Sequence, residues 1–170
     1  MVETTQQYIA RITGYVVGKD HLKVLQVTSK KLAGLVKKAT KKKLTQRPAP
    51  DKWSIAEILA HLAESEIVFA FRLRLVLGAS GAQIQAFDQN VWQDNAGYLN
   101  KDAQEALRLF ESIRASNIAL LKSLSKAQWE NYGMHQERGK ETVSRIVEMF
   151  AGHDINHTLQ VEGIVNGTRK

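Results

Sequence analysis

The sequence contains no cysteine, only two prolines and no apolar run long enough to span a bilayer. Without thiols, disulfide bonds, thiolate metal ligands and a cysteine nucleophile are all excluded, so any metal must be held by His, Asp or Glu. The run IVFAFRLRLVLG is interrupted at Arg72 and Arg74, and the first twenty residues lack the basic and then apolar layout of a secretory signal. We therefore expect a cytoplasmic protein that does not enter the membrane.

The length and apolar content fit one domain. A chain of 170 residues with 44% hydrophobic residues can bury a sizeable core. No internal repeat or shift in composition marks a boundary between domains. We predict a single domain over residues 1–170.

The net charge of +7 comes from one segment. Residues 28–43 hold seven lysines and no acidic residue, and the remaining 17 Lys and Arg equal the 17 Asp and Glu. The segment lacks the arginines and aromatics with which proteins usually contact nucleic acids, so a solvated helix face is favoured over a nucleic-acid site.

Helices are predicted by clear start signals and by apolar spacing. Ser54 can cap a helix, Glu57 completes a capping box, and the prolines at 48 and 50 keep the preceding chain extended. Asn100 or Asp102, and later Thr142, are further candidate caps. The predicted helices cover about residues 5–16, 20–39 with a break near 28–29, 55–77, 102–124 and 143–165.

Four of these helices are long and amphipathic, and no strand pattern is present. Each has an apolar stripe that must be buried against a neighbour, which predicts an all-α four-helix bundle. The connections at 83–100 and 127–141 are long, and long connections often carry functional residues. We expect both to cover a pocket.

Two histidines lie four residues apart in the stretch FAGHDINHTLQVEG. On a helix, His153 and His157 share one side near the apolar stripe, so both imidazoles can reach one ion. A catalytic zinc site typically needs a third protein ligand. His61, in the middle of the 55–77 helix, is the natural candidate. The alternative is three unrelated core histidines.

Polar residues on the core faces suggest either a network or a pocket. Asn117 and Arg114 fall on the apolar side of the 102–124 helix, and Asp154 lies next to His153. Buried groups of this kind are costly unless they are paired, so a structural network between helices is one interpretation. In the other, Asp154 orients a ligand imidazole and Arg114 holds an anionic substrate group.

Other residues are weaker candidates. His135, in a loop, could approach a metal as a general acid or base, or could be solvated. Glu57 and Glu64 share a helix side with His61 and could support it, although exposed carboxylates are the simpler interpretation. Trp53 is expected as a core or pocket-wall aromatic.

Several stretches together resemble the DinB/YfiT-like superfamily of bacterial four-helix bundles. They are RPAPDKWSIAEILAHLAESE, AFDQNVW, RASNIALLKSL, WENYGMHQERG and TVSRIVEMFAGHDINHTLQ. The most specific elements are a Trp-Ser helix start with a His seven residues after the Ser, and a His-x-x-x-His in the last helix. The resemblance implies an up-down-down-up bundle in which His61, His153 and His157 bind a divalent metal such as zinc or nickel.

The resemblance also implies a range of functions. Better-understood relatives are thiol S-transferases or isomerases that use a low-molecular-weight thiol such as bacillithiol or mycothiol, and YfiT-like members are described as metal-dependent hydrolases. A small-molecule substrate is therefore expected. The alternative is a stress-response or binding protein with a structural metal. The expectation of a homodimer is based on this resemblance alone.

Overall fold

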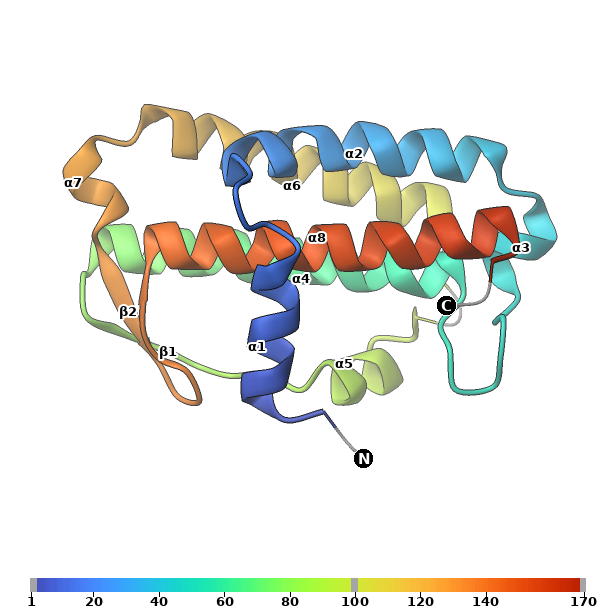
Figure 1. Ribbon diagram of the computed structural model, residues 1–170, viewed down its shortest axis with the longest axis horizontal. Coiled ribbons are helices and arrows are strands. Elements are labelled where there is room, and N and C mark those ends of the chain that lie inside the picture. Colours follow the sequence, from blue (N-terminus) through green and yellow to red (C-terminus); the bar gives the residue numbers. More distant parts are fainter. Residues whose placement is uncertain (1–2, 99–100, 169–170) are drawn as a thin grey trace.

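The computed structural model describes residues 3–98 and 101–168 and is built around four long helices (Figure 1). They are α2 (His21–Lys38), α4 (Ile55–Gly78), α6 (Ala103–Ser123) and α8 (Val143–Asn166). The prediction of an all-α four-helix bundle is confirmed, and each predicted long helix ends within one residue of its observed bounds. No helix among the described residues is long and apolar enough to cross a membrane.

The predicted caps begin the helices. The Ser54 hydroxyl accepts a hydrogen bond from the Glu57 amide, and the Glu57 carboxylate accepts one from the Ser54 amide, which completes the capping box. Asp102 and Thr142 cap α6 and α8, whereas Asn100 lies outside the described residues. The break predicted near residues 28–29 is absent, because Thr28 stays helical and donates to the Val24 carbonyl.

The helices run up, down, down and up (Figure 1). α2 and α8 point one way along the bundle and α4 and α6 the other way, and α4 packs against both α6 and α8. Because α4 and α6 are parallel, the chain between them must return along the whole bundle. That connection carries β1 (Ala82–Ile84) and α5 (Gln89–Asn95) past the open side of α4.

Shorter helices were missed or only partly predicted. α1 (Thr5–Gly14) ends two residues before the predicted limit and lies across α8. Its close approach requires Gly152, where an added Cβ would lie 2.2 Å from the Ile12 carbonyl oxygen. α3 (Lys41–Thr45) and α7 (Lys126–Trp129) are single turns within predicted connections.

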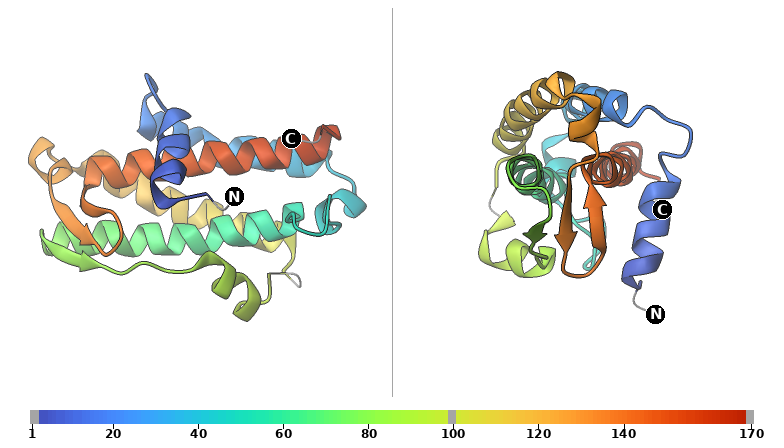
Figure 2. Two further views of the ribbon diagram at one scale, coloured as in Figure 1. Left: turned by 60° about the horizontal axis from the view of Figure 1, so that its bottom comes forward. Right: turned by 90° about the vertical axis from the view of Figure 1, so that its left-hand side faces the viewer.

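A small three-stranded sheet closes one end of the bundle (Figure 2). β2 (Tyr132–His135) pairs in parallel with β1 and antiparallel with β3 (Gly139–Thr142). The expectation of no strands was wrong. Strands of three or four residues are too short for alternation to be visible in the sequence, and β1 pairs with a segment some fifty residues away.

The core is divided by a polar layer. One apolar cluster, with Ile58 and Phe110, fills the end near α3, and a second, with Phe69 and Val147, fills the end near the sheet. Between them each long helix contributes a buried polar side chain. These are Thr28 on α2, Glu66 on α4, Arg114 and Asn117 on α6, and Asp154 on α8. Of the histidines, His153 is next to Asp154 in the chain, and His61 lies five residues before Glu66 on α4.

Candidate metal centre

Three histidines converge where α4 packs against α8. His61 projects from α4 towards His153 and His157, which lie one turn apart on α8, and one ring nitrogen of each lies within 4.8 Å of the other two. The Nε2 atoms of His61 and His153 are only 2.9 Å apart. The structure thus brings together the three residues that the sequence suggested as one ligand set.

Neighbouring side chains hold the imidazoles in place. The Trp53 ring stacks on His157 with an angle of 10° between the planes and lies 5.0 Å from the His61 ring. His157 Nδ1 lies 2.9 Å from Gln160 Oε1, and Ser65 Oγ lies 3.4 Å from His61 Nε2. His61 and His157 are buried, whereas His153 is partly exposed.

The site keeps its histidines uncharged. Burial lowers the pKa of His61 and of His153 well below the ordinary value of 6.5, and the neighbouring imidazoles lower both further. Burial also lowers the pKa of His157, to about 4, although Gln160 opposes this. Neutral imidazole is the form that binds metals, so the three rings are ready to act as ligands at neutral pH.

Two ring nitrogens of the cluster have no hydrogen-bond partner among the described residues. They are Nδ1 of His61 and Nδ1 of His153, and both are buried. If these atoms carry the ring protons, the two Nε2 lone pairs face each other at 2.9 Å, an arrangement that a cation between them would stabilise. The donor set therefore fits a divalent metal with a preference for nitrogen ligands.

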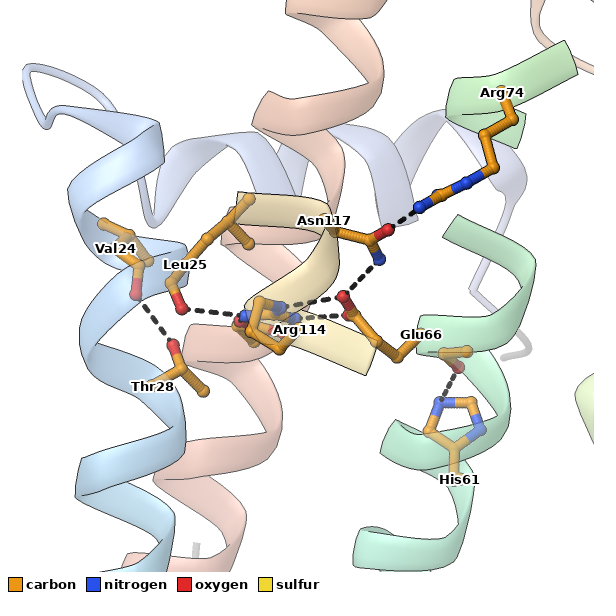
Figure 3. Close-up of polar contacts among 10 residues, drawn as sticks. Val24, Leu25, Thr28, His61, Glu66, Arg74, Arg114 and Asn117 are labelled. Carbon is orange, nitrogen blue, oxygen red and sulfur yellow. Dashed lines mark hydrogen bonds and ion pairs between the residues drawn. The ribbon is translucent and has the colours of Figure 1, made fainter. Parts of the chain in front are cut away.

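Arg114 organises the polar layer directly beside the histidines (Figure 3). Its guanidinium donates to Glu66 Oε2 at 2.6 Å, to Asp154 Oδ2 at 2.5 Å and to the Leu25 carbonyl at 3.0 Å. Asn117 donates to Glu66 at 2.7 Å and accepts from Arg74 at 2.9 Å. Through these contacts Arg114 joins α2, α4, α6 and α8.

The sequence allowed these polar residues to form either a structural network between helices or a substrate pocket. The observed contacts are those of a structural network. Asp154 pairs with Arg114 and makes no hydrogen bond to the three imidazoles among the described residues, so its suggested role in orienting a ligand has no support in the geometry. Arg114 is 3% exposed and its donors are used inside the core, so it does not hold a substrate anion. Burial alone would lower the pKa of Arg114, but the charges of Asp154 and Glu66 outweigh it and keep that pKa above its usual value.

His135 lies outside the cluster. It is buried on β2, with Nε2 3.4 Å from Arg72 Nη2, and its Nδ1 accepts from the Glu137 amide. Arg72 follows His61 by eleven residues along α4, which is about 16 Å at 1.5 Å per residue. His135 is thus not one of the histidines whose ring nitrogens converge, and a part for it in the reaction stays a prediction. The strand pairing that fixes His135 was not visible in the sequence.

The other candidates have different partners. Glu57 is buried and pairs with Arg47, so it is neither a support for His61 nor an exposed carboxylate. Glu64 makes no hydrogen bond to the histidines among the described residues. Sequence reasoning missed Glu66, the buried partner of Arg114. An acidic residue in the apolar half of α4 was the available signal.

Comparison with known proteins identifies the family. The family model of the DinB superfamily matches residues 25–161, which include all three histidines. The chain belongs to the DinB superfamily. This confirms the family resemblance found in the sequence.

Individual relatives of the chain have low sequence identity to it, but their alignments cover most of its length. A protein of Oceanobacillus iheyensis named "Putative metal-dependent hydrolase OB0413" is 23% identical over 143 residues, which cover 84% of this chain and 82% of that protein. "Putative metal-dependent hydrolase YfiT" of Bacillus subtilis is 22% identical over 142 residues, covering 82% and 79% of the two chains.

The fold of the chain also matches a solved structure. The structure described as "YfiT from Bacillus subtilis is a probable metal-dependent hydrolase with an unusual four-helix bundle topology" aligns with a TM-score of 0.80 and 19% identity. The alignment covers 96% of this chain and 89% of that chain. The likeness confirms the four-helix bundle.

Proposed function

We propose that His61, His153 and His157 hold a divalent cation, with zinc or nickel as the leading choices, and that the protein uses it in a reaction on a small molecule. The observation that carries this proposal is the convergence of three ring nitrogens within 4.8 Å, from two helices, in a setting that keeps them neutral. The names of the relatives, which call them metal-dependent hydrolases, support the same assignment.

The chemistry follows from the ligand set. A cation held by three neutral imidazoles keeps its full charge and open coordination positions, so it can polarise a substrate and lower the pKa of water or a thiol. The chain itself supplies the positioning. Trp53 covers one face of His157, and the Glu66–Arg114–Asp154 ion pairs fix α4 against α8.

Hydrolysis is the first candidate reaction, because the named relatives are called hydrolases. Thiol transfer is the second, and a different observation favours it. None of the hydrogen bonds of the three histidines within the described residues involves a carboxylate that could act as a base towards water. A thiol ionises more easily than water, and since the chain has no cysteine, that thiol must be a low-molecular-weight cosubstrate.

Two assays on metal-loaded protein test the proposal. Hydrolysis can be followed with 4-nitrophenyl acetate, and thiol transfer with cysteine and 1-chloro-2,4-dinitrobenzene. We expect a rate in at least one assay that disappears with EDTA and in His157→Ala, and returns to the wild type when zinc or nickel is restored. No metal-dependent rate in either assay, combined with a lower melting temperature after metal removal, would favour a structural metal instead.

The cytoplasmic location and the homodimer stay predictions. So does the assignment of the lysine-rich segment 28–43 to a solvated face, which lies on α2 and α3. Binding to mixed-sequence duplex DNA that persists at physiological salt would contradict that last assignment.

A further inference from the structure

A hollow lies beside α4, nearer the sheet end of that helix than His61 is. It has a volume of about 480 Å³ and is enclosed by α4, β1 and the segment that leads into α5. Its walls are almost entirely apolar, with Ile67 and Phe71 on α4 facing Phe87 and Trp92. The only charged residue among those that line it is Arg72.

Arg72 is a buried guanidinium without a carboxylate partner. It is 5% exposed and makes no ion pair among the described residues. Its Nη2 donates to the Gln85 carbonyl oxygen at 3.0 Å and lies 3.4 Å from His135 Nε2. Glu141, the acid that most favours its charge, is already bound by Arg138 at 2.7 and 3.0 Å.

The other donors of Arg72, Nε and Nη1, have no hydrogen bond within the described part of the chain. Arg72 is also one of the residues that line the hollow. An anion entering the hollow would meet unused N–H groups.

The charge of Arg72 persists under physiological conditions. Burial and, to a smaller extent, the nearby Arg138 lower its pKa to about 10, so the group stays protonated at neutral pH. A buried charge without a counter-charge is costly, so a bound anion would stabilise Arg72 by pairing with it. The low dielectric of the surroundings would strengthen the attraction between the two charges.

The apolar walls of the hollow favour an anion with a hydrocarbon body. Phe71 and Ile67 are 65% and 44% exposed, although both line the hollow. The rings of Phe87 and Trp92 are 4.8 Å apart, and Arg72 lies 5.7 Å from the centre of the Phe87 ring. A ligand with a flat or branched hydrocarbon body would cover these side chains while its charged end reaches Arg72.

We propose that this hollow binds a small monocarboxylate with an aromatic or branched apolar body. The carboxylate accepts hydrogen bonds from Arg72, and the body packs against Phe71, Phe87 and Trp92. The anion would bind at the Arg72 end of the hollow, and Arg72 lies eleven residues from His61 along α4, or about 16 Å. This binding does not depend on the function proposed above.

Calorimetric titration with 4-phenylbutyrate tests the proposal. The metal-loaded protein is titrated with this acid and, in parallel, with the neutral 4-phenylbutyramide, which has nearly the same shape. We expect the carboxylate to bind at least tenfold more tightly than the amide. Equal affinities would show that Arg72 does not recognise a charge and would overturn the proposal.

Three variants locate the binding. Arg72→Met should remove the tenfold preference, and Phe71→Ser, at an exposed position, should weaken both compounds about equally. Arg108→Met, which removes an exposed arginine of α6, is the matched control and should bind as the wild type does. Melting temperatures of all variants show whether each is folded. A folded Arg72→Met protein with an unchanged preference would contradict the assignment.

Two further outcomes would also overturn it. If EDTA or His157→Ala abolishes binding of 4-phenylbutyrate, the carboxylate is bound to the metal and not in the hollow. If sedimentation shows a dimer that Phe71→Ser dissociates, and the dimer does not bind the acid, the hollow is covered by a second copy of the chain.

Discussion

Nε2 of His61 and Nε2 of His153 lie 2.9 Å apart although 92 residues separate them in the chain. They meet because the up-down-down-up order makes α4 and α8 antiparallel neighbours. The polar layer then ties these two helices together through Arg114, which binds Glu66 on α4 and Asp154 on α8. The network therefore links the two helices that carry the histidines.

Replacing Arg114 should destabilise the protein strongly. Arg114→Met leaves Glu66 and Asp154 buried without their partner, and breaking a buried pair in this way costs about 3–5 kcal/mol. Urea unfolding of the variant and the wild type measures the loss. Arg145→Met is the control, since its partly exposed pair with Glu148 should contribute less than about 1 kcal/mol. Equal losses in the two variants would contradict the central role of Arg114.

Replacing Gly152 should displace α1. In Gly152→Ala the new Cβ would lie 2.2 Å from the Ile12 carbonyl oxygen, so the helices must move apart at a cost of about 1–3 kcal/mol. Faster tryptic cleavage at Arg11 and a lower melting temperature would report the movement. Gly34→Ala on α2 meets nothing within 4 Å and should instead stabilise the protein by about 0.5–1 kcal/mol. A Gly152→Ala protein as stable as the wild type would argue against the close contact.

The stability should depend on pH through His135. Burial lowers its pKa from 6.5 to about 4, with Arg138 and Arg72 adding to the effect. Between these values the unfolded chain binds more protons than the folded one, so stability is full above pH 6.5 and falls as the pH drops towards 4. His135→Asn should reduce this slope by about 1.4 kcal/mol per pH unit. Urea unfolding of both metal-free proteins at pH 7, 6 and 5 gives the two slopes, and identical slopes would contradict the prediction.

Much of the fold could be predicted because local signals and long-range packing agree. The Ser54 capping box and the caps at Asp102 and Thr142 fixed three helix starts, and the apolar stripes required a bundle. The helical spacing of His153 and His157 placed them on one side of α8 before any contact was known. These features depend on residues within a turn or two of one another.

The rest depends on contacts between distant segments. β1 pairs with β2 across the bundle end, and this pairing buries His135 beside Arg72. The sequence had indicated only that His135 lies in a loop. Sequence spacing allowed Asp154 to face either the histidines or Arg114. Only the packed helices show that Glu66 and Asp154 share Arg114. Side-chain partners across helices are not encoded in the period of any one helix.

The amount of divalent metal bound per chain tests the central claim most directly. Tag-free wild-type protein and His157→Ala are stripped of metal, reloaded with zinc or nickel, dialysed and analysed for metal content. The account predicts close to one equivalent in the wild type and a large loss in the variant, with both proteins folded. A wild type that binds no metal tightly, or a variant that binds as much, would contradict the assignment of His61, His153 and His157 as a metal site.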